Sequence, residues 1–333
     1  MKRANFPVSQ PGELYLTEGG TETEVLYKHG FELPEFAMFP LLDNPKAANI
    51  MRDMLQSQLD VAAEHQFSVM LTGLDYRASP DWGAKLGYSP EGLAEITIKS
   101  IDFLREVASD YRNQIPRILI GGVVGPRGDA YQLNRTITAD EAEDYHAVQL
   151  ATLNEAKVDF ACAMTFNNVP EAVGVSVAAA RIGVPLSIAL TVDSTSRLMS
   201  GPTVGEAIEA IDAQAGLSAP DFYLLNCSHP VEFEPALDEK GWMERLRGFR
   251  PNASKMEKIA LCKLGHLEEG DPEDLGRLMG DLAQRYPHMD IWGGCCGTGA
   301  KHLQEIAKNV NAARRADAGT ANVRRSEHSY RSN

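Results

Sequence analysis

The chain has 333 residues, 44% of them hydrophobic and 23% charged, and a formal net charge of −14 at pH 7. This composition indicates a globular protein with a large core and excludes disorder over most of the chain. Its body lacks clustered Lys and Arg, so nucleic-acid binding is not expected and a small-molecule partner is favoured. No run of about 18 apolar residues could span a bilayer and no apolar signal segment follows Met1, so we expect a cytosolic protein without a membrane partner.

Short apolar runs alternate with amphipathic stretches along the chain. We predict eight strands, the seventh with the weakest pattern, at 13–17, 68–72, 117–123, 159–164, 185–190, 222–226, 248–251 and 289–293. Helices are predicted between and after them at 46–66, 91–111, 138–156, 169–182, 203–216, 272–286 and 299–312. This alternation predicts a parallel sheet, and eight units can close it into an α/β fold, a single-domain (β/α)8 TIM barrel over residues 1–312.

An open doubly wound sheet is the alternative fold, but Gly19-Gly20 lacks the Gly-x-Gly-x-x-Gly spacing of a dinucleotide site. From Arg314 onward the chain is rich in Arg, Ser, Ala and Asn and has no apolar periodicity. We therefore predict that residues 313–333 form a polar C-terminal tail that is disordered or lies on a neighbouring subunit. The sequence leaves open whether the chain forms a homo-oligomer.

Three of the five cysteines follow predicted strands, Cys227 the sixth and Cys295-Cys296 the eighth. Because the carboxyl ends of barrel strands share one mouth, these three sulfurs are expected to converge there. Three thiolates with a fourth position left open suit Zn²⁺, which we predict as the cofactor. The alternative is that all three are small buried hydrophobic residues, while Cys162 and Cys262, which no motif surrounds, are expected to be core or surface thiols.

Adjacent ligands need an unusual backbone path, which nearby glycines supply: Gly293, Gly294, Gly297 and Gly299. Three thiolates around a zinc dication leave a local charge of −1, so the ion is a poor Lewis acid toward water but a good host for a further sulfur. A thiol substrate in the open position loses its proton and becomes a nucleophile for alkyl transfer. A thiol–disulfide enzyme using Cys295 and Cys296 is an alternative, although a disulfide between adjacent cysteines closes a strained ring.

The sequence resembles the zinc-dependent homocysteine S-methyltransferases, a family that includes S-methylmethionine-dependent and betaine-dependent enzymes. The resemblance extends to about Val310 and rests on four segments: 18–24, 125–129, 226–230 and 293–298. It implies a (β/α)8 barrel whose zinc is held by Cys227, Cys295 and Cys296, with the homocysteine sulfur as the fourth ligand. The chain departs from the family in carrying Glu18 in place of an Asp and Met164 in place of a Glu that holds the amino group of homocysteine.

Methyl transfer from a small onium donor to the thiolate of homocysteine, giving methionine, or to a close thiol analogue is therefore the predicted reaction. The alternative is a non-catalytic zinc-binding or thiol-sensing barrel. Nothing resembles a nucleotide or cobalamin motif, so the donor is expected to be a small diffusing cation or a methyl-carrying protein. We expect these residues to contact substrate: Glu18, Gly19, Gly20, Thr21, Tyr76, Met164 and Asn226.

The acidic side chains Glu18 and Glu22 are candidates for binding the substrate amine, and the N–H groups of Gly19 and Gly20 for binding its carboxylate. For Glu22 a solvated loop is the alternative. Tyr76 follows the second strand and could attract an onium donor by cation–π contact, or it could pack under its loop. His229 is not expected to bind the metal, because a fourth protein ligand would leave no room for a thiol.

Overall fold

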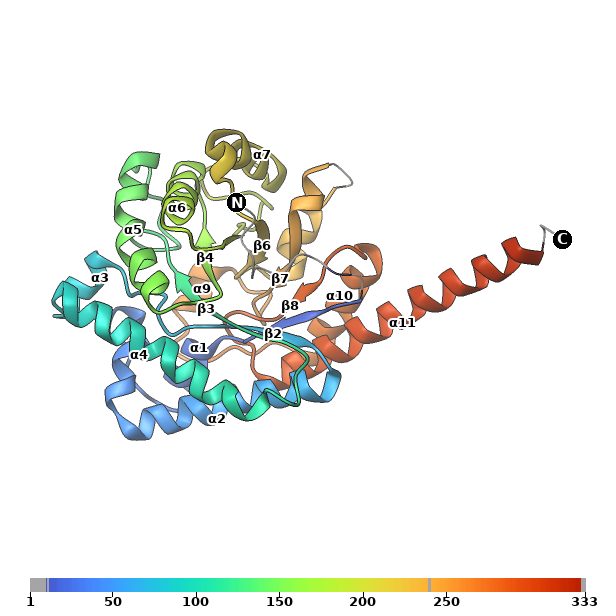
Figure 1. The fold of residues 1–333 in the computed structure, drawn as a ribbon, viewed down its shortest axis with the longest axis horizontal. Helices are drawn as coiled ribbons and strands as arrows, with labels where there is room; N and C mark the ends of the chain where they lie inside the picture. Colours follow the sequence, from blue (N-terminus) through green and yellow to red (C-terminus); the bar gives the residue numbers. More distant parts are fainter. Residues whose placement is uncertain (1–9, 11, 239–240, 331–333) are drawn as a thin grey trace.

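The computed structural model describes residue 10, residues 12–238 and residues 241–330. Its centre is a closed barrel in which every strand pairs in parallel with its two neighbours and the last strand pairs with the first (Figure 1). The strands are β1 (Tyr15–Thr17), β2 (Ser68–Thr72), β3 (Ile118–Val124), β4 (Phe160–Phe166), β5 (Leu186–Leu190), β6 (Phe222–Asn226), β7 (Leu246–Arg250) and β8 (Ile291–Trp292). The predicted (β/α)8 barrel is confirmed.

Helices follow each strand and form the outer layer. The α-helices are α1 (Thr21–Tyr27), α2 (Pro45–His65), α3 (Pro80–Lys85), α4 (Pro90–Ala108), α5 (Ala139–Glu155), α6 (Val169–Ile182), α7 (Val204–Ala215), α8 (Pro230–Phe233), α9 (Lys258–Cys262), α10 (Pro272–Arg285) and α11 (Ala300–Tyr330). Short 3-10 helices are η1 (Pro34–Phe36), η2 (Phe39–Asp43), η3 (Ser109–Tyr111), η4 (Gly216–Ser218), η5 (Glu234–Ala236) and η6 (Gly241–Arg245).

Side-chain caps fix where the long helices begin. The Asn44 side chain accepts hydrogen bonds from the N–H groups of Lys46 and Ala47, and Pro45 occupies the first turn of α2, where no N–H is needed. Thr138 and Glu141 form the predicted capping box of α5, each side chain bonding the other's backbone N–H. These helix starts could be predicted because their signals are local.

Two apolar layers stabilise the barrel. Strand β4 shows the alternation, since Phe160, Cys162 and Met164 belong to the cluster inside the barrel, whereas Ala161 and Ala163 pack against the helices outside. Cys162 is thus a buried core thiol, as expected, and the side chain of Cys262 lies outside the described residues. The filled interior leaves the carboxyl-terminal mouth as the place for a cavity.

Several boundaries differ from the sequence prediction. Strand β7 begins at Leu246 rather than at 248, because Arg247 is buried there by an ion pair with Asp290 that a local pattern cannot show. The regular part of β8 is only two residues long, since the chain leaves the sheet at Gly293. Helix α1 was not predicted, and the loop alternative for Glu22 is therefore wrong.

Helix α11 continues to Tyr330, beyond the predicted end at Ala312, and extends away from the barrel (Figure 1). Residues 313–330 belong to this helix in the structure, and their Ala and Arg content favours a helix while their sequence contains no Pro. That residues 313–333 are a polar tail, disordered or lying on a neighbouring subunit, stays a prediction. The N-terminal part of α11 packs on α2 and α10. A domain boundary at residue 312 remains a prediction.

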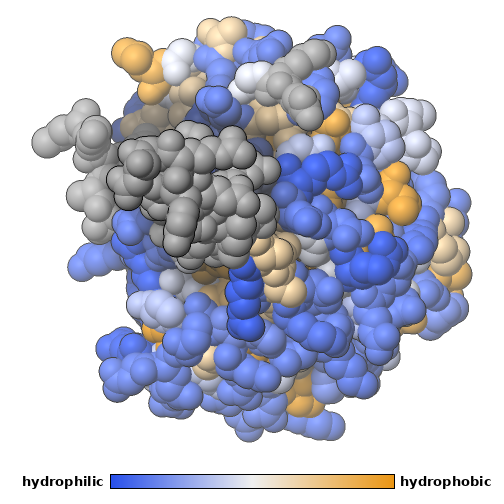
Figure 2. All heavy atoms as spheres, turned by 90° about the vertical axis from the view of Figure 1, so that its right-hand side faces the viewer, coloured by the Kyte–Doolittle hydropathy of each residue, from blue (hydrophilic) through white to orange (hydrophobic). Residues whose placement is uncertain are grey.

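Within the described residues, no helix combines the length and apolar character that a membrane span requires. The face turned toward the viewer in Figure 2 is mostly hydrophilic, with hydrophobic residues scattered in small patches. Isolated surface patches of this kind are normal for a globular protein.

Candidate metal centre and substrate cavity

The three cysteines that the sequence singled out meet at the carboxyl-terminal mouth of the barrel. Cys227 directly follows β6, and Cys295 and Cys296 follow β8. The Sγ atom of Cys227 lies 2.8 Å from that of Cys295 and 3.6 Å from that of Cys296, and all three sulfurs lie within 4.8 Å of one another. The predicted convergence is confirmed.

Backbone contacts hold the two cysteine turns in place. Cys227 has a left-handed φ of +55° and donates its N–H to the carbonyl of Arg250, 3.0 Å away. Cys295 donates its N–H to the carbonyl of Pro251 at 2.8 Å. A Cβ on Gly20 would lie 2.4 Å from the Cys295 carbonyl oxygen, so only glycine lets the start of α1 approach this turn.

The sulfur cluster is partly buried, with Cys227 buried and Cys295 and Cys296 partly exposed, and its thiols have unequal acidity. Hydrogen bonds from Cys295 and Cys296 lower the pKa of Cys227 well below its usual value, and the hydroxyl of Tyr131, 3.3 Å from this sulfur, contributes further. Their hydrogen bonds to Cys227 raise the pKa of the Cys295 and Cys296 thiols well above the usual value. Without a metal ion, Cys227 is therefore the cysteine that most readily loses its proton and carries the negative charge.

The donor set fits a zinc ion with one open position. Thiolates about 2.3 Å from a tetrahedral ion lie roughly 3.8 Å apart. The 3.6 Å between Cys227 and Cys296 is close to this spacing, whereas the 2.8 Å between Cys227 and Cys295 is shorter, so Cys295 would move outward to bind the ion. Three soft sulfur donors without a carboxylate among them favour zinc over magnesium or calcium. Among the described residues, the group that could hold an ion consists of the three cysteines and does not include His229, whose Nδ1 accepts the N–H of Val231 at the start of α8.

The cysteines form part of the wall of a cavity of about 320 Å³. The cavity is bordered by all of the predicted substrate residues: Glu18, Gly19, Gly20, Thr21, Tyr76, Met164 and Asn226. Sequence segments that are far apart thus meet around one space of the size that holds a small molecule. Their contact with substrate remains a prediction.

The segment Glu18-Gly19-Gly20 already binds to other parts of the protein. The Glu18 carboxylate forms a buried ion pair with Arg250 and accepts the N–H of Thr72 at 2.9 Å. Gly19 donates its N–H to the side chain of Gln58 at 2.9 Å, and Gly20 donates to the carbonyl of Thr298 at 2.9 Å. A substrate carboxylate could bind these N–H groups only if the existing hydrogen bonds broke. In this structure the segment therefore stabilises the wall of the cavity.

The carboxylate of Glu22 has less compensation of its charge than that of Glu18. Its side chain lines the cavity, and its Oε2 atom accepts a hydrogen bond from the Thr21 hydroxyl at 3.3 Å. Burial raises the pKa of Glu22, and repulsion from Glu18 adds to the rise. Among the described residues, no basic side chain lies within ion-pair distance of this carboxylate.

Strand β4 and Asn226 support the same cavity. Thr165 has a φ of +60° at an irregularity of β4, and its N–H donates to Oδ1 of Asn226 at 3.1 Å. The Nδ2 atom of Asn226 lies 3.9 Å from the Cys295 sulfur, so this side chain links β4 to the cysteine turn. The Tyr76 hydroxyl bonds Thr165, and Met164 presents an apolar wall.

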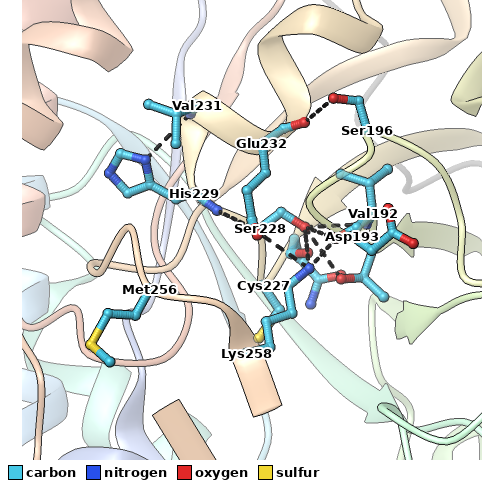
Figure 3. A network of polar contacts seen from close by, with 12 residues as sticks. Val192, Asp193, Ser196, Cys227, Ser228, His229, Val231, Glu232, Met256 and Lys258 are labelled. Carbon is cyan, nitrogen blue, oxygen red and sulfur yellow. Dashed lines mark hydrogen bonds and ion pairs between the residues drawn. The ribbon is translucent and has the colours of Figure 1, made fainter. Parts of the chain in front are cut away.

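Sequence reasoning missed two buried cations of the site. Arg250 ends the weakly patterned β7, and its partner Glu18 is 232 residues away in the chain. Lys258 begins the short helix α9, and Figure 3 shows its ammonium directed at Ser228 and Val192, beside Cys227. Neither residue lies in a motif, so only the fold could identify them.

Comparisons with known proteins identify the family and agree with the fold. The model of the family described as homocysteine S-methyltransferase matches residues 15–310. The metallated form of the homocysteine methyltransferase MmuM from Escherichia coli is 18% identical, with a TM-score of 0.70, and the match covers 90% of this chain and 96% of that one. The apo form of MmuM is 16% identical, with a TM-score of 0.64 and the same coverage. The chain belongs to the homocysteine S-methyltransferase family and is a methyltransferase built on a (β/α)8 barrel.

Proposed function

We propose that this protein is a zinc-dependent S-methyltransferase that moves a methyl group from a small onium donor to the sulfur of homocysteine, giving methionine, or to the sulfur of a close analogue. The observation that carries the proposal is the convergence of three cysteine sulfurs on the wall of one cavity. Cys227, Cys295 and Cys296 would hold the ion, which would be accessible from the cavity. A cytosolic location and small-molecule partners are part of the proposal.

When bound, zinc supplies a substrate thiolate at neutral pH by lowering the pKa of the thiol. The onium–methyl bond breaks as the sulfur–methyl bond forms, and the electron pair of the broken bond stays with the neutral leaving group. No general base is needed at that step, because the sulfur has already lost its proton. The protein therefore acts mainly by holding the two reactants in line and by excluding water.

Tyr76 is proposed to contact the donor. Its ring borders the cavity, and its hydroxyl is held by Thr165. The Arg77 guanidinium lies over the same ring, 5.2 Å from the centroid, so a donor cation would use the opposite face. Met164, which belongs to the apolar cluster inside the barrel, also borders this cavity.

Glu22 is proposed to bind the ammonium group of the acceptor. Met164 stands where the family resemblance places a carboxylate, whereas Glu22 brings an unpaired carboxylate into the same cavity from α1. Glu18 is less available, because Arg250 already neutralises it. An arriving cation would offset the burial that raises the pKa of Glu22.

Glu22→Gln is expected to raise the KM for the acceptor about 10- to 100-fold with little change in kcat, since a hydrogen bond to a charged group is worth roughly 1.5–3 kcal/mol. Initial rates at varied acceptor and donor would show it. Glu24→Gln is the matched control, because Glu24 lies on the same helix, lines no part of the cavity and is 4.0 Å from Lys28. A rise in the donor KM alone would assign Glu22 to the donor instead.

The function itself can be tested by X-ray absorption at the zinc edge of the purified protein. We expect three sulfur ligands and a fourth sulfur when homocysteine is added. Methyl transfer is then assayed with S-methylmethionine, S-adenosylmethionine, betaine and dimethyl sulfonium compounds. An unchanged zinc shell and no methylated product would favour a non-catalytic zinc-binding barrel, the reading that the apolar Met164 supports.

A further inference from the structure

Lys258 is a buried cation behind the sulfur cluster. Only 7% of the residue is exposed, and it borders both the main cavity and a smaller neighbouring one. Its Nζ donates to the Ser228 hydroxyl at 2.9 Å and to the carbonyl of Val192. A buried ammonium is costly unless its protons are bonded, and here two are bonded to neutral oxygens.

The contacts of Lys258 lead directly to the turn that carries Cys227. Ser228 follows Cys227, and its hydroxyl also donates to the Val192 carbonyl at 2.9 Å. Lys258 thus joins α9 to the end of β5 and to the left-handed turn after β6 (Figure 3). In the same view His229 is turned toward Val231, so Lys258 and not His229 lies on the Cys227 side of this turn.

The positive charge of Lys258 is only partly compensated. Its nearest carboxylate oxygen, on Glu232, is 3.8 Å from Nζ, beyond hydrogen-bond distance. That same oxygen accepts the N–H of His229 at 3.0 Å, and burial raises the pKa of Glu232. The positive charge of Lys258 can therefore still stabilise a negatively charged group beside it.

We propose that Lys258 is a positioning residue for the metal centre: it holds the Cys227 turn through Ser228 and places a positive charge beside the anionic tris-thiolate site. This inference rests on the proposed zinc site. Three thiolates and a dication carry a net charge of −1, and in a buried site a nearby ammonium lowers the energy of that charge. The expected consequence is a tighter metal site.

The test is the zinc dissociation constant, measured by competition with a chromophoric chelator. Lys258→Met, which removes the charge and its hydrogen bonds, is expected to weaken zinc binding about 10- to 100-fold, as is typical for loss of an outer partner of a metal ligand. Lys258→Arg keeps charge and donors and is expected to recover most of the affinity. Lys255→Met is the control, since exposed Lys255 pairs with Asp274 at 2.7 Å.

Unfolding curves establish that each variant is folded, and the visible spectrum of the cobalt-substituted protein reports whether the three sulfurs still bind. Equal affinity of folded Lys258→Met and the unaltered protein would overturn the inference, as would a loss that Lys258→Arg does not recover. If Lys258→Met does not fold, Ser228→Ala takes its place, with about 10-fold weaker binding expected and equal affinity overturning the inference. Absence of stoichiometric zinc in the unaltered protein would instead count against the proposed function.

Discussion

Replacing Cys296 with serine is expected to abolish stoichiometric zinc and methyl transfer together. The Cys296 sulfur lies 3.6 Å from that of Cys227 in the cluster, and a serine hydroxyl there has neither the acidity nor the softness of a thiol. Loss of an outer partner of a ligand costs about 10- to 100-fold in metal affinity, so loss of the ligand itself should exceed about 100-fold. Metal analysis after dialysis and a methyl-transfer assay measure both effects.

Cys162→Ala provides the control for this substitution. Cys162 is also a buried thiol, but it lies on β4 inside the barrel core and outside the sulfur cluster. Its removal is expected to leave zinc content unchanged, although the small void it creates lowers stability. Full methyl transfer by metal-free Cys296→Ser would contradict the proposed role of the cluster.

The strands that could be predicted from sequence are those whose burial shows in the local pattern. β2 and β6 have the predicted bounds, because each is a run of five buried residues that ends at a polar residue or a turn. The start of β7 was missed because Arg247 reads as a surface residue until its partner Asp290 is brought beside it. Contacts between distant segments override local preference in such places.

Helix α1 was hidden for a related reason. Its first residues alternate Thr and Glu, which gives no apolar stripe of helical period. Thr23 is buried there by polar contacts instead, since its hydroxyl donates to the Gly20 carbonyl at 2.8 Å and accepts the N–H of Gly297 at 3.1 Å. The partner of this helix is the cysteine turn itself, which lies more than 270 residues later.

For the site, the motif residues identified the sulfurs but not the charges that surround them. Thiols near glycines predict a metal centre because their chemistry is specific. Arg250 and Lys258 carry no such signal, since a lone basic residue in a sequence is most often on the surface. Their burial follows from the closure of the barrel, which places the ends of β1, β6 and β7 around one mouth.

The stability of the protein is expected to fall between about pH 4 and pH 7 through a single buried carboxyl group, that of Asp75. Its side chain has no exposed surface; Oδ2 accepts the N–H of Val123 at 3.2 Å, and Oδ1 has no hydrogen-bond partner among the described residues. Burial raises the pKa of Asp75 to about 7, and the nearby charges of Glu22 and Glu18 add to the rise. The folded state therefore holds a proton that the unfolded chain has lost.

The sign of the effect follows from the two pKa values. Asp75 titrates near 3.8 in the unfolded chain and near 7 in the folded protein, so its favourable contribution is complete below the lower value and is lost as the pH rises through the higher one. The size of this contribution is roughly 2–4 kcal/mol.

The Asp75→Asn side chain is neutral at every pH, so the free energy of unfolding of this variant should lack this loss. The stability of the variant relative to the unaltered protein should therefore increase from pH 5 to pH 8. Urea unfolding at both pH values measures the difference, with exposed Asp53→Asn on α2 as the control for removing one carboxylate. The same pH dependence in Asp75→Asn and the unaltered protein would show that this carboxyl group is ionised in the folded state throughout the range.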